Sequence, residues 1–353
     1  MSSPSPVTVD SPPPPPAPGP SSSSSGSFGL YNRFQAWRRS LDLPNPGTTE
    51  NVGKECKGTL LNNLAFDGAR ADLSKSLSMN PHFNVTHSFN LGSQTAPPSY
   101  HFGALFANDK MFMHGNIDHD GNLSARLNQG WSADNVSKLQ AQLSTTPGQS
   151  FVQLEHDYSG ADYSLNAKAV NPSPADLTGI YMGSYLQSIT KNLALGVEGM
   201  LQRPSPAAAE LATAYMAKYT STNRDWIATA QLQGAGMIQA SYWQKLSEKV
   251  DVAAELQVIA GQGRRDALAT VGARYELRMA SFRAQLDSTG KVSAYLEQRF
   301  APTFSFLVSG EIDHFKNAAK VGVGVMIESA SMTPEEMGMV SPGQMPMPGM
   351  PQP

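Results

Sequence analysis

The chain has 353 residues, a formal net charge of -3 and a pI near 6.2. Proteins that bind nucleic acid normally carry a basic patch or stripe, so this charge balance argues against that class. Charged residues make up 16% of the chain, below the roughly 25% of a typical soluble domain, which fits a protein with one surface that does not face water.

The single cysteine, Cys56, leaves no internal disulfide possible. No stretch approaches the roughly 18 consecutive apolar residues of a membrane helix, and the mean hydropathy is -0.31. A hydropathy profile alone would therefore class the protein as soluble. A membrane β-barrel escapes that test, because its apolar and polar residues alternate and average out.

Residues 1–27 are almost entirely Pro and Ser, so we expect a disordered tail. They lack a secretory signal and the arginines of a cleaved mitochondrial presequence, which predicts a protein made in the cytosol and kept whole. Residues 28–47 form a short amphipathic segment that is broken by Pro44 and Pro46. Its aromatic side could rest on a membrane or a partner, or the segment could be a frayed helix against its own protein.

Residues 49–64 are predicted to form the one substantial helix, in an inner-helix unit that we place at 48–65. A threonine at 48 or 49 can cap it, and Val52, Cys56 and Leu60 stack at four-residue spacing. Gly53 and Gly58 weaken the helix, so packing rather than propensity must hold it.

From residue 66 to residue 329 the pattern is that of strands. We count about 19 windows of roughly 9 to 11 residues in which apolar and polar side chains alternate, the length that crosses a membrane when tilted. The last window, 320–328, is typical, with Val321, Val323, Val325 and Ile327 on one face. The windows around 109–118 and 208–219 are less distinct.

Short turn signals separate the windows, at residues 118–122, 159–162, 234–236 and 288–290. Turns this tight join antiparallel neighbours, which excludes a parallel α/β sheet. The sequence therefore predicts an all-β fold, a transmembrane antiparallel β-barrel of about 19 strands whose first and last strands pair in parallel. A helix through the lumen, rising about 1.5 Å per residue, would return the N-terminal tail to the mouth where the last strand ends.

Five segments resemble the channel-forming subunit of the mitochondrial outer-membrane protein translocase, the TOM complex, most closely in its fungal members. They are residues 68–93, 101–131, 185–198, 225–234 and 310–328. The resemblance extends in order over about residues 48–329, whereas the tail at 1–27 and the Met/Pro-rich tail at 330–353 do not match closely. It implies a barrel of 19 strands, distantly similar to the mitochondrial porin VDAC, with an inner helix before the first strand.

The resemblance also implies a function, which is a protein-conducting channel for the import of precursor proteins across the mitochondrial outer membrane. The implied partners are precursor proteins, the receptor and small helical subunits of the TOM complex, a second copy of the barrel, and membrane phospholipid. Two alternatives stay open at this point. One is a VDAC-like metabolite or ion pore, and the other is a soluble β-protein that binds a ligand.

The polar face of the strands carries charges of both signs, so side-chain parity alone predicts a mixed lumen. The resemblance implies acidic patches that guide basic presequences along the pore. The candidate carboxylates on the polar face are Asp72, Glu276, Glu297, Glu311 and Asp313. They could instead simply pair with cations on neighbouring strands.

Lys75 lies on the lipid-facing parity of the first strand, where a lysine must snorkel to headgroups or meet a partner. The resemblance places the matching lysine at the contact between two barrels, near lipid and the receptor subunit's membrane helix. The last strand also resembles the sorting signal of mitochondrial barrels, in which a polar residue is followed by a glycine and two hydrophobic residues. Lys320, Gly322, Val325 and Ile327 fill those positions.

Signals for catalysis are poor. The seven histidines form no HExxH motif, and one cysteine cannot build a zinc site, so we predict no metal and no cofactor. An SxxK match at 188–191 lies in a turn without the partner motifs of a Ser/Lys hydrolase. We therefore predict that the protein is not an enzyme.

Overall fold

The computed structural model describes residues 41–329, apart from 62–63, 94–96, 147, 235 and 262–263, together with Arg33 and Arg38. The predicted tails at 1–27 and 330–353, and most of the amphipathic segment at 28–47, lie outside the described residues. In the described part of the chain, no helix is both long enough and apolar enough to span a membrane. All the strands belong to one compact unit that begins at Leu43.

In the described residues, nineteen strands follow a short helical region, and the two less distinct windows form β4 and β11. The first ten are β1 (Gly68–Met79), β2 (His82–Asn90), β3 (Ser99–Ala107), β4 (Met111–Asp118), β5 (Leu123–Gly130), β6 (Asn135–Leu143), β7 (Phe151–Ser159), β8 (Tyr163–Val170), β9 (Gly179–Ser188) and β10 (Leu193–Ser205). The other nine are β11 (Ala208–Thr220), β12 (Trp226–Gln233), β13 (Met237–Ser247), β14 (Val250–Gly261), β15 (Arg264–Glu276), β16 (Ala280–Asp287), β17 (Lys291–Ala301), β18 (Phe304–Asp313) and β19 (Ala318–Ser329).

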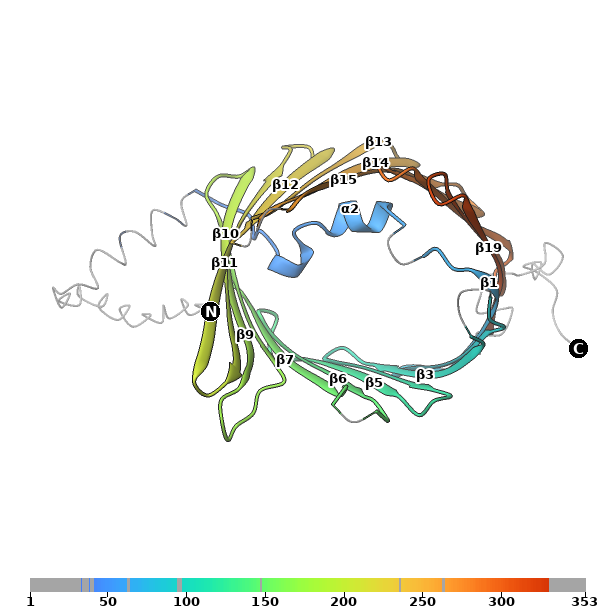
Figure 1. The fold of residues 1–353 in the computed structure, drawn as a ribbon, viewed down its shortest axis with the longest axis horizontal. Helices are drawn as coiled ribbons and strands as arrows, with labels where there is room; N and C mark the ends of the chain where they lie inside the picture. The colour runs from blue at the N-terminus through green and yellow to red at the C-terminus, as the bar shows by residue number, and fades with distance from the viewer. Residues whose placement is uncertain are drawn as a thin grey trace, which may run out of the picture. The chain divides into compact units, whose positions relative to one another are not determined.

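The sheet closes on itself, and Figure 1 shows the strands as a ring. Each strand pairs with the next in antiparallel fashion, whereas β1 and β19 pair in parallel from Gly68 opposite Gly322 to Lys75 opposite Ser329. The predicted all-β barrel with a parallel closing pair is thus confirmed. Each strand in the described residues therefore has a hydrogen-bonded neighbour on both sides, which a wall facing lipid requires because hydrocarbon cannot satisfy backbone groups.

Apolar side chains run around the outside of the barrel in register. Phe282, Leu296, Val308 and Val323 lie opposite one another on successive strands, and the row crosses the parallel seam to Ala69. Val323 is 42% exposed in the isolated barrel. These residues therefore line an outer surface rather than a shared dry core, as expected for a wall that faces lipid.

The helical region is shorter than the predicted helix at 49–64. It consists of a 3-10 turn, η1 (Thr49–Asn51), and an α-helix of 6 residues, α2 (Lys54–Thr59). Gly53 separates the two with a backbone outside the helical region, and Leu60 is extended. The helix is too short to be stable alone, so its conformation depends on the barrel wall against which it packs.

Candidate functional site in the barrel lumen

Residues 44–61, which we call the luminal segment, lie inside the ring of strands, where Figure 1 shows α2. The segment starts beside the last residue of β9, since the Ser188 hydroxyl donates to the Pro44 carbonyl at 2.7 Å. Antiparallel pairing makes odd-numbered strands run in one direction, so this start lies near the rim where β19 ends. The segment leads toward β1, which begins at the opposite rim.

Two further buried serines hold the first part of the luminal segment. The Ser164 hydroxyl on β8 donates to the Gly47 carbonyl at 2.6 Å, and Ser184 on β9 shares a hydrogen bond of 2.8 Å with the Thr49 hydroxyl. Each serine lies on the inner face of its strand and is buried by the segment that it binds. Short hydroxyl side chains here allow the segment to lie directly on the wall.

A cluster of ion pairs fastens the luminal segment to β6, β7 and β8. The Glu50 carboxylate lies 3.1 Å from the Lys138 ammonium and 3.1 Å from that of Lys168. Lys138 also contacts Glu155 at 3.0 Å and Asp157 at 2.6 Å, while Lys168 lies 3.7 Å from Glu155. The cluster therefore holds three carboxylates and two ammonium groups, and Glu50 is the nearest carboxylate to Lys168.

The charge state of Glu50 follows from this setting. Burial raises the pKa of its carboxyl, but the hydrogen bonds and charges of Lys168 and Lys138 outweigh burial, so the pKa lies below its ordinary value. Glu50 is therefore ionised at neutral pH and can serve as a permanent anionic contact.

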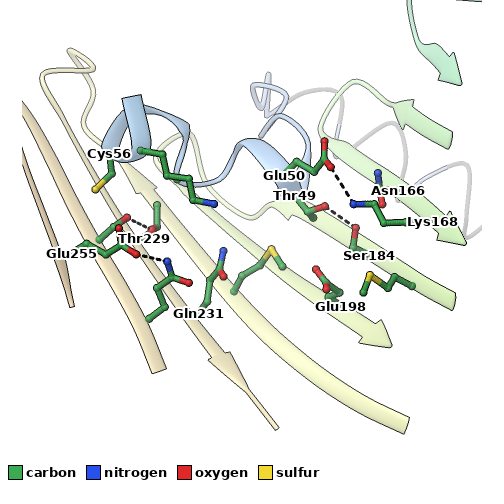
Figure 2. Close-up of a pocket in the computed structure, with 16 residues that line it drawn as sticks. Thr49, Glu50, Cys56, Asn166, Lys168, Ser184, Glu198, Thr229, Gln231 and Glu255 are labelled. Carbon is green, nitrogen blue, oxygen red and sulfur yellow. Dashed lines mark hydrogen bonds and ion pairs between the residues drawn. The ribbon is translucent and has the colours of Figure 1, made fainter. Parts of the chain in front are cut away.

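Apolar contacts continue along the segment. Val52 packs with Leu186, Ala194 and Met216 in one buried cluster. Figure 2 shows the adjoining region, with Thr49 beside Ser184 and Glu50 beside Lys168. The inner face of β9 to β11 thus provides an apolar patch beneath this part of the segment.

The second apolar cluster fixes α2 itself. Cys56 and Leu60 pack on Ala253 of β14, with Trp243 beside them. A Cβ atom at Gly272 would lie 2.7 Å from a methyl group of Leu60, which is too close for an undisturbed contact. The wall therefore requires a glycine at this position to accept the leucine side chain.

The last part of the luminal segment reaches β16, β17 and β18. Leu61 packs with Tyr295 and Leu307, and its backbone N–H donates to the Gln285 side-chain oxygen at 2.8 Å. Every part of the segment thus contacts wall strands that lie between β6 and β18.

The chain then passes over the last strand before it enters β1. A Cβ atom at Gly322 would lie 2.3 Å from the Phe66 carbonyl oxygen, and one at Gly324 would lie 3.1 Å from the Phe66 ring. The Phe66 N–H donates to the Ser309 hydroxyl at 3.2 Å. The two glycines of β19 therefore form a shallow seat for the residue that precedes the barrel.

A cavity of about 190 Å³ lies between the luminal segment and the wall, and Figure 2 shows its lining. Glu198, Glu255, Lys57 and Lys168 make this cavity polar. Burial raises the pKa of the Cys56 thiol to about 11, with the Glu255 charge adding to the effect. A thiol that keeps its proton at neutral pH is a poor nucleophile.

The five carboxylates predicted to line the pore all lie on inner-face positions, but four are paired with cations. Glu276 contacts Arg274, Glu297 lies 3.4 Å from Arg299, and Glu311 lies 3.1 Å from Lys291. These pairs join residues of the same or adjacent strands. The pairing that sequence analysis left open is therefore present in the structure.

Asp72 and Asp313 differ from the other three carboxylates. Asp72 is only 3% exposed, with Arg70 at 2.7 Å and a hydrogen bond of 2.6 Å from Ser88. Asp313 accepts the backbone N–H groups of residues 315 and 316 in the turn after β18. Both carboxylates thus have a local structural role, and the structure does not gather the five into one continuous acidic surface.

Lys75 lies exposed on the outer face of β1, between Leu73 and Leu77 and near the end of the strand. In β19, Val325 and Ile327 lie on the outer face, whereas Lys320 lies on the inner face opposite Glu311. Their roles as a contact residue and as a sorting signal stay predictions.

Comparison with known proteins agrees with the fold. The sequence profile of the eukaryotic porins matches residues 45–322. The mitochondrial import receptor subunit TOM40 of Saccharomyces cerevisiae is 43% identical over 321 residues, which cover 85% of this chain and 82% of the yeast protein. The chain belongs to the TOM40 family of eukaryotic porins.

Other members of the TOM40 family show how far the similarity extends. The tom40 subunit of Neurospora crassa is 38% identical over 318 residues, which cover 87% of this chain and 89% of that protein. The human TOM40 homolog is 32% identical over 298 residues, which cover 81% and 79% of the two chains. The similarity therefore covers most of the chain in a fungal and an animal relative alike.

Sequence analysis missed the contacts that fix the luminal segment of this TOM40 family member. Glu50 lies in the predicted helix, where a single acidic residue carries no particular signal. Lys138 alternates with apolar residues in the window that forms β6, so its inward position could have been inferred. Its pairing with Glu50 could not, because 88 residues separate the two.

Relatives in the TOM40 family are named as import receptor subunits, which indicates transport rather than catalysis. One group of potential metal ligands occurs in the described residues, namely Asp118, His119 and Asp120 in the turn after β4. A hydrogen bond with Asp118 raises the pKa of the His119 imidazole above its ordinary value. These exposed groups satisfy one another, and we assign them no chemistry.

Proposed function

We propose that this chain is the protein-conducting channel of a mitochondrial outer-membrane translocase and imports precursor proteins through its lumen. The single observation that carries this proposal is the closed 19-stranded wall, apolar outside and polar inside, in a chain 43% identical to a TOM40 subunit. A channel of this kind acts by passive conduction and weak contacts along its wall. No covalent chemistry on the substrate is required.

A reconstitution experiment tests the proposal. Purified protein in a planar bilayer should conduct ions, and a basic amphipathic presequence peptide should block the current from one side. A control peptide of the same composition but scrambled order, without an amphipathic face, should block far less. A current that is insensitive to the presequence peptide would instead favour a VDAC-like metabolite pore.

We also propose that Glu276, Glu297 and Glu311 contribute to the presequence path, with Asp72 and Asp313 as part of the same inner face. Each of the three glutamates pairs with a partly exposed cation, so a passing basic side chain can exchange into the pair. Pairs of this kind are weak and sensitive to salt.

Replacement of Glu276, Glu297 and Glu311 by Gln tests this path without adding new charge. We expect presequence affinity to fall about fivefold at low salt and to converge with the parent at high salt. The matched control is Glu248→Gln in the exposed turn after β13. Unchanged affinity of the triple variant at low salt would contradict the proposed path.

The proposed partners are the receptor and small helical subunits, a second barrel and phospholipid, and Lys75 is the proposed contact residue. Its ammonium lies on the outer face among leucines, where an anionic headgroup or a partner carboxylate would offset its desolvation. Lys75→Ala should reduce the dimeric translocase on a native gel, whereas Lys191→Ala in the turn after β9 should not. If the amount of dimer were unchanged in the Lys75 variant, the lysine would not contact a second barrel and would only extend its ammonium group to the lipid headgroups.

We further propose that Lys320, Gly322, Val325 and Ile327 act as the sorting signal. Since Gly322 also seats Phe66, variants of the whole protein cannot separate recognition from folding. A peptide of residues 318–329 separates them, because it has no barrel to fold. It should compete with the insertion of newly made barrels into isolated mitochondria, and the same peptide with Gly322→Ala should compete less. Equal competition by both peptides would argue against the signal.

A further inference from the structure

We infer that the luminal segment is a permanent part of the channel wall rather than a movable gate, and that Glu50 is the residue that positions it. This inference rests on the proposed function, because it concerns the surface past which a polypeptide would move. It goes beyond the presence of a helix in the lumen by stating which contacts hold the segment and whether it moves during import.

The attachments between the luminal segment and the wall are closely spaced. Wall contacts occur at Pro44, Gly47 and Thr49, then at Glu50 and Val52. They continue at residues 56, 58, 60 and 61, where the Arg283 guanidinium donates to the carbonyl of residue 58 at 2.9 Å. No free stretch longer than three residues remains between two attachments. A hinged gate needs a longer free stretch about which it can turn.

The wall would lose buried hydrogen bonds and apolar contacts if the luminal segment moved away from it. The buried hydroxyls of Ser164, Ser184 and Ser188 would lose their partners, and Leu186 would expose an apolar face inside a polar lumen. Each hydroxyl would have to exchange its hydrogen bond for water, and each apolar group would have to be hydrated. The wall under the segment is thus built to be covered.

Glu50 fixes the position of the luminal segment along the wall. It is the only residue of the luminal segment that forms ion pairs with the wall in the described part of the chain, and two ammonium groups converge on it. Apolar contacts hold the segment against the wall but tolerate sliding, whereas two short charged hydrogen bonds fix its position along the strands. A cation at this position would face Lys138 and Lys168 and would be expelled.

One consequence is that substrate cannot reach the wall beneath the luminal segment and contacts the part that the segment leaves uncovered, which includes Glu276, Glu297 and Glu311. Among the described residues, no hydrogen bond or ion pair from the luminal segment reaches β1 to β5. The inner faces of those strands carry mostly uncharged polar residues, such as Thr86, Asn116 and Asn128. We infer that a translocating polypeptide also contacts this arc of the wall.

A reversible crosslink tests whether the segment moves. In a Cys56→Ala background, which removes the only native cysteine, Thr49→Cys is combined with Ser184→Cys, whose parent hydroxyls are 2.8 Å apart. We expect nearly complete disulfide formation on mild oxidation. The oxidised channel should conduct ions and import a model precursor at the rate of the reduced channel.

Each other outcome of the crosslink experiment overturns the inference. Import that stops on oxidation and recovers on reduction would show that the segment must move. A pair that does not crosslink would show that the segment is not seated. The matched control pair, Thr49→Cys with Thr86→Cys on β2, should not crosslink, and ready crosslinking there would reveal a segment that crosses the lumen.

Glu50 is tested in the same background by charge reversal and rescue. Glu50→Lys should slow formation of the 49–184 disulfide about tenfold or more and should make the single-channel current unstable. Adding Lys168→Glu should restore both, since it recreates an oppositely charged pair. If Glu50→Lys crosslinks at the parent rate, Glu50 does not position the segment.

A failure of the proposed channel function and a failure of the inference about the luminal segment give different results. The parent Cys56→Ala channel reports on the proposed function through presequence block and precursor import. The disulfide rate reports on the segment alone and needs no transport. Glu50→Gln provides a milder variant should Glu50→Lys fail to yield a folded barrel, and it should slow the disulfide in the same direction.

Discussion

The two arcs of the lumen wall differ in what their inner faces do. From β6 to β18 many inner-face residues are buried, including Leu186, Ala253 and Leu307, because the luminal segment covers them. Among the described residues from β2 to β5, Gly103 alone is buried, and the inner face stays open to water. The same strand pattern therefore forms a packed interface on one arc and a wet surface on the other.

The alternation of apolar and polar residues along a strand therefore does not by itself decide the role of a side chain that faces the lumen. An inward serine on β9 is a buried hydrogen-bond donor, whereas an inward threonine on β2 faces water. The covered arc should behave like the core of a soluble protein, with large effects of substitution. The open arc should tolerate change, as a polar surface does.

The largest effect is expected at Gly322, a wall glycine over which Phe66 packs. Gly322→Ala would place a methyl group against the Phe66 backbone carbonyl, which cannot rotate away. We expect a loss above about 4 kcal/mol, seen as failure to form the heat-modifiable folded band on a gel. Gly103→Ala on the open arc meets only ordinary contacts at 3.8 Å and should fold like the parent. If both variants folded equally well, the covered and open parts of the wall would not differ in their tolerance of a methyl group.

Leu60→Ala should give the next largest effect. The leucine is only 1% exposed and fills the pocket over Gly272 and Ala253. Its truncation should lower the free energy of unfolding by about 3 kcal/mol in a urea titration. Leu105→Ala, on the inner face of β3, should cost less than about 1.5 kcal/mol because its side chain is only partly buried. If Leu105→Ala lowered the free energy of unfolding more than Leu60→Ala, the luminal segment would not cover the arc from β6 to β18.

Lys138→Gln should have an intermediate effect. It leaves Glu50, Glu155 and Asp157 with one remaining ammonium group. Because the lysine side chain is 17% exposed, water screens part of the loss, and we expect about 2 kcal/mol of destabilisation. The channel should also become more cation-selective, measured as the reversal potential in a salt gradient. Arg126→Gln on β5 is the control, since this arginine is exposed.

Cys56 provides a smaller, kinetic test of the covered arc. Its pKa of about 11, against an ordinary value of 9.0, should make alkylation at pH 8 about 100-fold slower than for a free thiol. A cysteine introduced at Thr86 should react at the rate of a free thiol. The folded thiol holds its proton more tightly than the unfolded one, so stability from this group should fall as pH rises from 9.0 toward about 11. Rapid alkylation of Cys56 would show that the segment lifts from the wall.

The smallest effect is expected at the rim of the open arc. The hydrogen bond with Asp118 raises the pKa of His119, so its stabilising contribution is complete below the ordinary pKa and is lost as pH rises through the raised value. Its exposure keeps the effect on stability slight. An NMR titration should show the raised pKa in the parent and the ordinary value in Asp118→Asn. If the pKa of His119 were the same in Asp118→Asn as in the parent, the hydrogen bond with Asp118 would not be the cause of the raised value.

Much of the fold could be predicted because the barrel pattern is local. Each strand shows its two faces within about ten residues, and each tight turn shows its neighbour. The parallel pairing of β1 and β19 followed from an odd strand count. The helix length could not be predicted, because Gly53 and Leu60 take conformations that depend on contact with the wall.

The candidate site was predictable only in part. Inner-face positions of Asp72, Glu276 and Glu311 follow from parity, and the pairs of Asp72 with Arg70 and of Glu276 with Arg274 lie within one strand. Only the pair of Glu311 with Lys291 depends on the register between two strands. The anchoring role of Glu50 had no sequence signal at all. Its partners, Lys138 and Lys168, lie 88 and 118 residues away in the chain.

The amino-acid sequence by itself predicted a barrel of about 19 strands and determined which side of each strand meets lipid, because a period of two residues is set by local backbone geometry. Tertiary structure alone decided which inner surface is covered and which stays open to water. The physical reason is that the four-residue spacing of Val52, Cys56 and Leu60 predicts a helix in residues 44–61 but does not specify the wall strands against which it packs. Residues 44–61 take their position from serine hydroxyls, paired charges and apolar patches that only the closed wall brings together.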